Sequence, residues 1–308
     1  TMIFYVFAVL FAIFGLYVFD KMRTRKLKIV KKILEEKVDE RTEELAIKNA
    51  ELAEKNKDIT DSIRYAKRIQ EAILPPEHVI KNAFQNSFVF SKPKDIVSGD
   101  FYWLEKKEDE ILFAAVDCTG HGVPGALMSI VGSNILNQAV HENIAIIPAR
   151  LLDKLNKGVS ETLNQTSEDT KLRDGMDIAL CSINFKSMEL QYAGAYNPLL
   201  IIRGKELIEV KADNIAIGSY TETQQQHYTN HIIPLQKGDT IYIFSDGFAD
   251  QFGGPDGKKF KLTQFKTMLM NLNGVSMDQQ KIALARSIDE WRGVLQQVDD
   301  MLVIGVRV

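Results

Sequence analysis

A long segment without glycine or proline constrains the fold of this chain more than any other feature. It runs from Lys26 to Leu74 and is dense in Glu, Lys and Arg. Within it, one column of mostly apolar residues recurs at every seventh position: Val38, Leu45, Leu52, Ile59, Ala66 and Ile73. A strict seven-residue repeat indicates a left-handed coiled coil.

If this column occupies the d positions, the a positions are mostly polar: Thr42, Asn49, Asn56, Ile63 and Gln70. Polar residues at a cost stability, but they favour a defined register and a low oligomer state. We therefore predict a parallel homodimer through a coiled coil within residues 21–76. A single solvated helix with charged faces is the alternative interpretation.

The segment before the coil is apolar without interruption from Met2 to Phe19. As a helix it would rise about 27 Å, close to the roughly 30 Å hydrocarbon core of a bilayer. Basic residues follow directly, at Lys21, Arg23, Arg25, Lys26 and Lys28. Positive charge beside a span marks its cytoplasmic side. We predict that residues 1–20 form a single-pass helix in the inner (cytoplasmic) membrane, with the rest of the chain in the cytoplasm.

Two other interpretations of the apolar segment are weaker. A signal peptide would carry a basic region before it and a small-residue cleavage site after it, and the sequence has neither. A buried core helix would need a comparably apolar partner segment, which the chain does not offer. Because residue 1 is Thr rather than an initiator Met, we expect a longer protein with a sensing domain upstream.

Pro75 and Pro76 end the helical segment, since proline cannot continue the backbone hydrogen-bond ladder. Beyond them, the expected strands are Phe88–Phe90, Ile111–Val116, Ile178–Phe185, Leu190–Tyr196, Leu199–Ile202, Thr240–Ser245 and Met301–Val308. The expected helices are Gly125–Glu142, Pro148–Asn164, Leu262–Leu272 and Met277–Gly293. Grouped strands with intervening helices predict an α+β domain over residues 77–308 with largely antiparallel sheets. The stretch Gly204–Lys237 receives no assignment.

Charge and cysteine content exclude several classes of protein. A formal net charge of −3 gives no reason to expect a nucleic-acid partner. Cys118 and Cys181 lie far apart and form neither a disulfide framework nor a zinc-site spacing, which fits a reducing compartment. No His/Asn arrangement supports Cys118 as a nucleophile.

Acidic residues stand where the expected strands meet loops: Asp100, Asp117, Asp246, Asp299 and Asp300. For a single Asp-Gly pair, a structural turn is the ordinary interpretation. Several carboxylates converging from separate strands would repel one another unless cations lay between them. Oxygen ligands suit Mg²⁺ or Mn²⁺, and the absence of a Cys/His cluster argues against zinc.

Five motifs carry a resemblance to a known family: SGDFYW, DCTGHGVPGALMS, YAGAYNP, GDTIYIFSDG and VDDMLVIGV. In this order and spacing they resemble the metal-dependent protein serine/threonine phosphatases, often called protein phosphatase 2C-like. Within that family the sequence looks like the bacterial branch named for stage II sporulation protein E (SpoIIE). The resemblance covers roughly Ala72 to Val308. It implies two antiparallel β-sheets sandwiched between helical layers (αββα), with the metal site at one edge of the sandwich.

The resemblance also implies a metal site, position by position. Asp117 matches the aspartate that bridges two metals, and the backbone carbonyl of Cys118 matches a neighbouring contact. Asp246 and Asp299 match the remaining carboxylates, and Asp100 matches an outer acidic residue that acts through water. Asp117, Asp246 and Asp299 are thus the expected catalytic residues. Two Mn²⁺ or Mg²⁺ ions would activate a water that hydrolyses phosphoserine or phosphothreonine.

Further residues near these motifs have two interpretations each. Asp300, next to the preferred ligand, is another candidate ligand. Asp174 and Asp177 lie near the region where some relatives bind a third metal, or they cap a turn and start a strand. His121 either donates a proton or stabilises its turn. Lys94 is a candidate phosphate contact or a solvated surface lysine.

The predicted function is a phosphoprotein phosphatase in bacterial signal transduction, under control of a membrane sensor. Relatives in this branch act on small anti-sigma-factor antagonists, which makes such a phosphoprotein the implied substrate. The alternative is a non-catalytic, membrane-anchored receptor or scaffold with a phosphatase-like fold, which the retained aspartates disfavour. A sensor histidine kinase would need a glycine-rich ATP lid and an Asn-bearing ATP helix, and the sequence shows neither.

Overall fold

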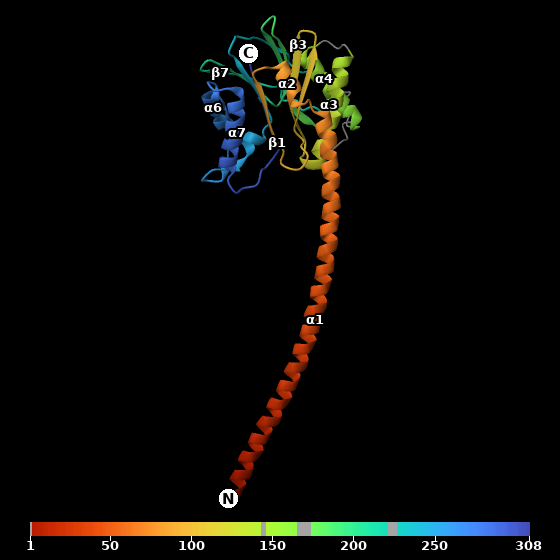
Figure 1. Cartoon of the computed structure of the whole chain (residues 1–308), viewed down its shortest axis with the longest axis vertical. Coiled ribbons are helices and arrows are strands. Elements are labelled where there is room, and N and C mark those ends of the chain that lie inside the picture. The colour runs from red at the N-terminus through yellow and green to blue at the C-terminus, as the bar shows by residue number, and fades with distance from the viewer. Residues whose placement is uncertain (1, 143–145, 165–173, 221–226) are drawn as a thin grey trace. The chain divides into compact units, whose positions relative to one another are not determined.

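The computed structural model describes residues 2–142, 146–164, 174–220 and 227–308. Figure 1 shows the chain with its elements labelled. Its contacts divide it into two compact units, residues 1–62 and residues 63–308. The uninterpreted stretch Gly204–Lys237 falls partly outside the described residues, at 221–226.

The first unit is helical throughout. Helix α1 runs without a break over Met2–Ile73, so its last turns belong to the second unit. Its apolar beginning is long and apolar enough to cross a membrane, judged by length and composition. The coiled-coil column is exposed along this unit: Val38 is 56% exposed and Ile59 is 58% exposed. In a single chain, the apolar column of the heptad repeat is therefore exposed to solvent.

The second unit contains two five-stranded sheets whose neighbouring strands are all antiparallel. The first sheet has the order β1 (Ser87–Lys92), β12 (Met301–Arg307), β9 (Thr240–Phe244), β6 (Leu199–Arg203) and β7 (Glu206–Val210). The second has the order β2 (Phe101–Lys107), β3 (Glu110–Cys118), β4 (Met176–Asn184), β5 (Glu189–Ala195) and β8 (His231–Pro234).

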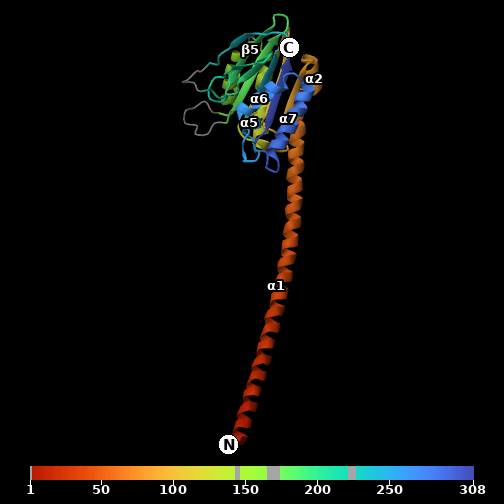
Figure 2. The ribbon, with the colours of Figure 1, turned by 90° about the vertical axis from the view of Figure 1, so that its left-hand side faces the viewer.

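Helices cover the outer faces of both sheets. Figure 1 shows α3 (Gly122–His141) and α4 (Pro148–Thr162) on one side of the sheets, with α6 (Leu262–Leu272) and α7 (Met277–Arg292) on the other. In Figure 2 the face carrying α6 and α7 is turned toward the viewer. Short elements complete the unit: α2 (Glu77–Ala83), α5 (Gly247–Asp250) and the hairpin of β10 (Phe252–Gly253) with β11 (Lys258–Lys259).

Three apolar cores hold these four layers together. Strand β3 shows how the sequence builds them, because its side chains alternate between faces. Phe113 and Ala115 point into the core between the sheets, whereas Leu112 and Val116 join the core beneath α3 and α4. A third core, which includes Phe244, lies between the first sheet and α6 and α7. Burying one such large apolar side chain stabilises the fold by about 1.5–3 kcal/mol.

The predicted fold class, two antiparallel sheets between helical layers, is confirmed. The seven expected strands and four expected helices are all present, with ends shifted by a few residues. Strands β2, β7 and β8 were not expected from the sequence. β2 ends in charged residues and β8 is a short sheet edge, so neither shows a long apolar run.

The boundary of the second unit also differs from the sequence division, which placed the domain start at residue 77. Contacts place it at Ile63. Gln70 explains the difference, because its side chain is buried against the domain. Its amide donates to the Ser98 carbonyl (2.6 Å) and the Ser129 hydroxyl (2.9 Å) and accepts from the Ser98 backbone N–H (3.1 Å).

Candidate active site

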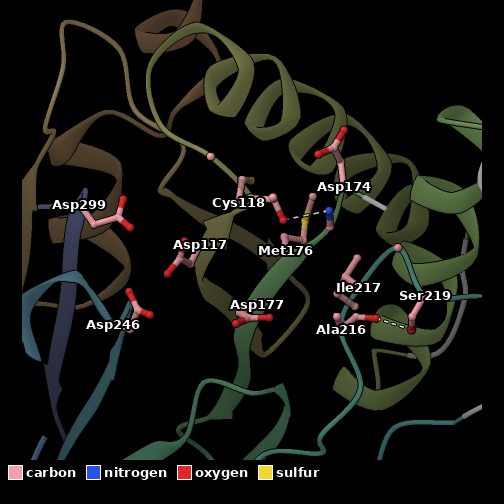
Figure 3. A pocket seen from close by; sticks show the side chains of 14 residues that line it. Asp117, Cys118, Asp174, Met176, Asp177, Ala216, Ile217, Ser219, Asp246 and Asp299 are labelled. Atoms are coloured by element: carbon pink, nitrogen blue, oxygen red, sulfur yellow. Dashed lines mark hydrogen bonds between the residues drawn. The ribbon is translucent and has the colours of Figure 1, made fainter. Parts of the chain in front are cut away.

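Aspartates from both sheets line one cavity of about 420 Å³ at one end of the sandwich (Figure 3). Asp117 lies near the end of β3 and Asp177 near the start of β4, directly opposite each other in the antiparallel ladder. Asp246 follows β9 and Asp299 precedes β12 in the other sheet. The topology therefore brings together carboxylates that are far apart in sequence. Asp174 also lines the cavity, farther from this group in the view of Figure 3.

The opposite wall consists of small residues and backbone. Thr119 extends the pairing of β3 and β4, because its N–H donates to the Gly175 carbonyl (2.9 Å) and its hydroxyl accepts from the Gly175 N–H (3.1 Å). A side chain at Gly175 would begin only 2.3 Å from the Ile217 carbonyl oxygen. The remaining wall is formed by Gly120, Met176, Ala216, Gly218 and Ser219. These wall residues are uncharged.

The carboxylates at this end raise one another's pKa values. Burial, followed by repulsion from Asp246 and Asp299, raises the pKa of Asp117 to about 8. Burial, followed by Asp246, raises the pKa of Asp177 to about 6. Burial also raises the pKa of Asp246, and Asp250 and Asp299 add to it while Lys259 opposes it. When they are ionised, these clustered carboxylates carry more negative charge than the surrounding residues neutralise.

A hard divalent cation fits this donor set. The ligands available are carboxylate oxygens and backbone carbonyls, which Mg²⁺ and Mn²⁺ prefer. Among the described residues, no three His, Cys, Asp or Glu side chains already stand in the geometry of a direct metal shell. Mg²⁺ usually keeps several waters and takes only one or two carboxylates directly. The cavity is therefore compatible with ions held partly through water.

Asp100 contacts the cavity carboxylates from the interior of the domain. It is buried, 5% exposed, and does not line the cavity. Its carboxyl accepts a hydrogen bond from the Ser245 hydroxyl and shares another with Asp117. Burial raises its pKa well above the usual value, with Asp117 as the next cause. Ser245 itself precedes Asp246, so Asp100 links the two sheets at the site.

Asp299 and Asp300 have different surroundings although they are neighbours. Asp299 lines the cavity, and one of its oxygens accepts the backbone N–H of Asp300 (2.9 Å). Asp300 is 2% exposed, and its two oxygens accept the backbone N–H groups of Lys94 and Gly99, both at 2.7 Å. The structure thus places Asp300 in a structural role and leaves Asp299 facing the cavity. From its motif Asp300 was another candidate metal ligand, whereas in the structure both of its carboxylate oxygens accept backbone N–H groups instead.

The loop after Asp117 passes close to other backbone. Gly120 has φ = 83°, in the left-handed region that favours glycine. Its carbonyl would lie only 2.5 Å from a side chain at Gly99 and 2.2 Å from one at Gly125. The backbone of Cys118 lines the cavity, whereas its side chain is buried in the core beneath α3. Burial raises the pKa of that thiol, so it is no nucleophile.

Two weaker candidates lie outside the cavity. His121 Nδ1 is 2.7 Å from a carboxylate oxygen of Asp95, and both side chains are about half exposed. This contact ties the loop before α3 to the loop after β1, as expected for a turn-stabilising histidine. Lys94 contributes its backbone N–H to Asp300 and does not line the cavity.

Some residues that shape the site were not identified from the sequence. Residues 216–219 fall in the stretch without assignment, and Thr119 is an ordinary residue in its motif. The motif YAGAYNP was matched to the family, but its Tyr192 hydroxyl donates to the Asn197 carbonyl (2.7 Å) within the second sheet and does not line the cavity. A glycine next to an aspartate, as at Gly175, was the available hint.

Comparison with known proteins agrees with this geometry. The family model described as "Stage II sporulation protein E (SpoIIE)" matches residues 107–308, more than half of the chain. The chain belongs to the SpoIIE family. The SiaA-PP2C domain of Pseudomonas aeruginosa shares 33% identity and superposes with a TM-score of 0.75. That match covers 82% of this chain and 98% of the SiaA domain, so the second unit of this SpoIIE-family protein is a PP2C-type domain.

Two more distant relatives add to the comparison. Phosphoserine phosphatase RsbU of Bacillus subtilis (strain 168) is 24% identical over 196 residues, which are 63% of this chain. The chain spans only 55% of the length of RsbU. RsbX, solved in complex with magnesium, shares the fold at 14% identity with a TM-score of 0.51, covering 72% of this chain and 94% of RsbX. The suspected SpoIIE-type phosphatase family is thereby confirmed.

Proposed function

We propose that this chain is a bacterial signalling phosphatase that hydrolyses phosphoserine or phosphothreonine in a protein by metal-activated water. One observation carries the proposal: carboxylates from both sheets line a single cavity, where burial and repulsion from neighbouring carboxylates raise the pKa values of Asp117, Asp177 and Asp246. Family membership and the activity of the relative RsbU support it. The non-catalytic scaffold is not favoured, because the aspartates matched to the family share this one end of the domain.

Each of the site residues has a proposed role in metal binding. Asp117, Asp246 and Asp299 would hold two Mn²⁺ or Mg²⁺ ions, with the Cys118 carbonyl as a further contact and Asp100 acting through water. Such ions lower the pKa of a water and neutralise charge on the transferring phosphoryl group.

Other parts of the site shape how substrate enters. The small wall around Gly175 and Gly218 leaves room for a phosphorylated segment beside the carboxylates. No side chain needs to become phosphorylated, because a metal-activated water would attack the phosphorus directly. Asp177, with Asp174 behind it, is our candidate for a third ion.

Phosphate release from a phosphoserine peptide tests the proposal directly. The full chain in detergent should release phosphate with Mn²⁺ and should stop when EDTA removes the metal. Asp117→Asn should remove this activity while the circular dichroism spectrum stays unchanged. A folded wild-type chain without activity on several phosphoserine and phosphothreonine proteins would support the scaffold instead. Small anti-sigma-factor antagonists are the substrates to try first.

We further propose that Met2–Phe19 anchors the chain in the cytoplasmic membrane with the phosphatase domain in the cytoplasm. The length and apolarity of the start of α1 support this, as do the basic residues that follow. Chain that is recovered in the soluble fraction without detergent would contradict it. So would protease protection that places the domain on the outer face.

The exposed heptad column supports a parallel homodimer. Leu45 and Leu52 are 59% and 58% exposed on the single chain. Pairing two chains would cover this stripe, and Asn49 and Asn56 would fix the register. Cross-linking of a cysteine introduced at Leu52 should join two chains efficiently, whereas one introduced at the neighbouring Glu51 should not. Equal cross-linking at both positions would contradict the coil.

We also propose that this helix transmits a signal from a membrane sensor. The polar a positions support it, because they keep the coil from being maximally stable and two packings can then have similar energies. Fusing a stable zipper in successive registers should make phosphatase turnover cycle with the heptad. Turnover that is equal in all registers would leave the coil as a passive tether.

A further inference from the structure

Gln251 is fully buried and follows α5 directly. Its Nε2 donates to the carbonyls of Phe252 (2.9 Å) and Gln296 (3.0 Å), and its Oε1 accepts the backbone N–H of Val298 (3.1 Å). Its own carbonyl accepts from the indole of Trp291 (3.1 Å). The side chain therefore uses its acceptor and both donors, although it has no access to water.

These bonds join the two segments that carry cavity carboxylates of the first sheet. Asp246 begins α5, where its carbonyl accepts the backbone N–H of Asp250 (3.0 Å), and Gln251 ends that turn. Val298 directly precedes Asp299. The bond between Gln251 and Val298 thus spans from the Asp246 segment to the Asp299 segment.

The strand ladder ends before it reaches these carboxylates. β9 and β12 pair as far as Phe244 with Val303, and the Ser245 N–H still donates to the Leu302 carbonyl (3.0 Å). Beyond that point the two segments lead into α5 and into the loop before β12, and they remain in close contact, because a side chain at Gly247 would begin only 1.9 Å from the Asp300 carbonyl oxygen. The Gln251 amide adds hydrogen bonds between these segments at Gln296 and Val298, so it can hold the loop that carries Asp299 against the segment that carries Asp246.

Gln280 provides a matched comparison in the same layer of the molecule. It is also fully buried, and its amide accepts from the Tyr242 hydroxyl (2.7 Å) and donates to the carbonyls of Leu272 (3.0 Å) and Val275 (3.3 Å). It joins α7 to the turn after α6, and none of its partners adjoins a cavity aspartate. Two glutamines with the same burial and the same bonding thus differ in what they connect.

We propose that Gln251 is a positioning residue that sets the spacing of the Asp246 and Asp299 carboxylates and thereby the affinity of the site for divalent cations. This inference rests on the proposed function. Removing the amide frees the loop before Asp299, so a cation held by both carboxylates is bound less tightly. Residues that orient ligands in this way typically change metal affinity 10- to 100-fold when replaced.

The test compares Gln251→Met with Gln280→Met in the full chain in detergent. Electron paramagnetic resonance of free Mn²⁺ measures binding without any substrate, and thermal unfolding in EDTA measures stability. We expect both variants to lose stability, but only Gln251→Met to bind Mn²⁺ 10- to 100-fold more weakly. Excess Mn²⁺ should restore its turnover, with an unchanged KM for a phosphoserine peptide. Equal Mn²⁺ affinity in wild type and both variants would overturn the inference.

A milder variant covers the case in which Gln251→Met does not fold. Gln297 is only partly buried, and its amide donates to the carbonyls of Lys92 and Asp299, both at 2.8 Å. Gln297→Ala should loosen the same loop and weaken Mn²⁺ binding a few-fold, and unchanged binding would overturn the inference. A wild-type chain that neither binds Mn²⁺ nor hydrolyses the peptide would instead overturn the proposed function.

Discussion

The two ends of strand β9 carry aspartates with opposite surroundings, and only the first of them is buried. Asp239 precedes the strand and is 1% exposed, and its carboxylate accepts two-pronged hydrogen bonds from Arg203 at 3.0 and 2.7 Å and one from the Gln236 N–H at 2.8 Å. Asp246 follows the strand and faces other carboxylates. The chain neutralises the first carboxylate by itself, whereas the second end accumulates negative charge. Asp239 is thus paired with Arg203 of the same chain, whereas we propose that Asp246 is paired with a bound cation.

The largest expected effect comes from Asp117→Asn, at the uncompensated end. Mn²⁺-dependent hydrolysis should fall on the order of 10³-fold or more, because the residue expected to bridge both ions loses its charge. Stability in EDTA should stay the same or increase, because one repulsive charge is removed. Phosphopeptide kinetics and thermal unfolding of the same sample check both parts. A variant that keeps its activity would place the site elsewhere.

Replacing the neighbours Asp299 and Asp300 separately should split activity from stability. Asp299→Asn should lower turnover on the order of 10²-fold at fixed Mn²⁺, with little change in unfolding. Asp300→Asn should cost about 1–3 kcal/mol of stability, since its carboxylate satisfies two buried backbone N–H groups. Urea unfolding and Mn²⁺ titration measure the two effects. The reverse outcome would exchange the roles assigned to the pair.

Asp239→Asn tests the compensated end. It leaves Arg203 without its counter-charge, and Arg203 is partly exposed, so we expect a loss of about 2–3 kcal/mol. Mn²⁺ affinity and turnover per folded molecule should not change. Urea unfolding with a Mn²⁺ titration gives both values. A changed Mn²⁺ affinity would show that the two ends are coupled through β9.

The pH dependence of the metal-free protein should reflect the uncompensated end. Folding raises the pKa of Asp117 to about 8 and that of Asp177 to about 6, whereas an unfolded aspartate titrates near about 3.9. The folded state then binds more protons than the unfolded state, so stability falls as the pH rises from about 4 toward 8. In EDTA, Tm should drop by roughly 10–20 °C between pH 5 and pH 8.

Two additions sharpen the pH experiment. Mn²⁺ at pH 8 should raise Tm, because the ion binds the ionised carboxylates of the folded state. Asp117→Asn should show a smaller drop in EDTA than the wild type. A Tm that rises between pH 5 and pH 8 in EDTA would mean that these carboxylates are neutralised within the chain.

The smallest expected effect is that of His121→Asn. His121 contacts Asp95 and lies outside the cavity, so turnover should change less than about threefold and the pH profile should keep its shape. A loss of about 10²-fold together with a lost limb of the pH profile would instead make His121 a proton donor.

The sequence predicted those parts of the molecule whose signals are local. Short apolar runs rich in Val, Ile and Phe predicted β3, β4 and β12, and Asp at a strand end with Gly nearby indicated Asp117 and Asp246. The separate roles of Asp299 and Asp300 depend on which backbone N–H groups come close in space, and adjacency in sequence carries no such information.

Other parts escaped sequence analysis for the same physical reason. β2 has only a short apolar run, Phe101–Leu104, before it ends in three charged residues, so its apolar signal is weak. Gln251 looks like any polar residue after a turn, and only the packing of three distant segments buries it. Gln70 was assigned to a polar a position of the coil, yet its amide is satisfied by Ser98 and Ser129 of the domain.

The buried amide of Gln70 has a geometric consequence for α1. Each residue of an α-helix is turned by about 100° from the one before it, and backbone hydrogen bonds keep the helix from twisting locally. Ser98 adjoins Gly99 and Asp100, whereas Ser129 belongs to α3, so the two partners of Gln70 sit on different segments of the domain. Both can be reached at only one angle of the last helical turn about its axis. Rotating the last turn of α1 about its axis would break at least one hydrogen bond of the buried Gln70 amide. The stability of this part of the catalytic domain therefore depends on the rotational position of the helix.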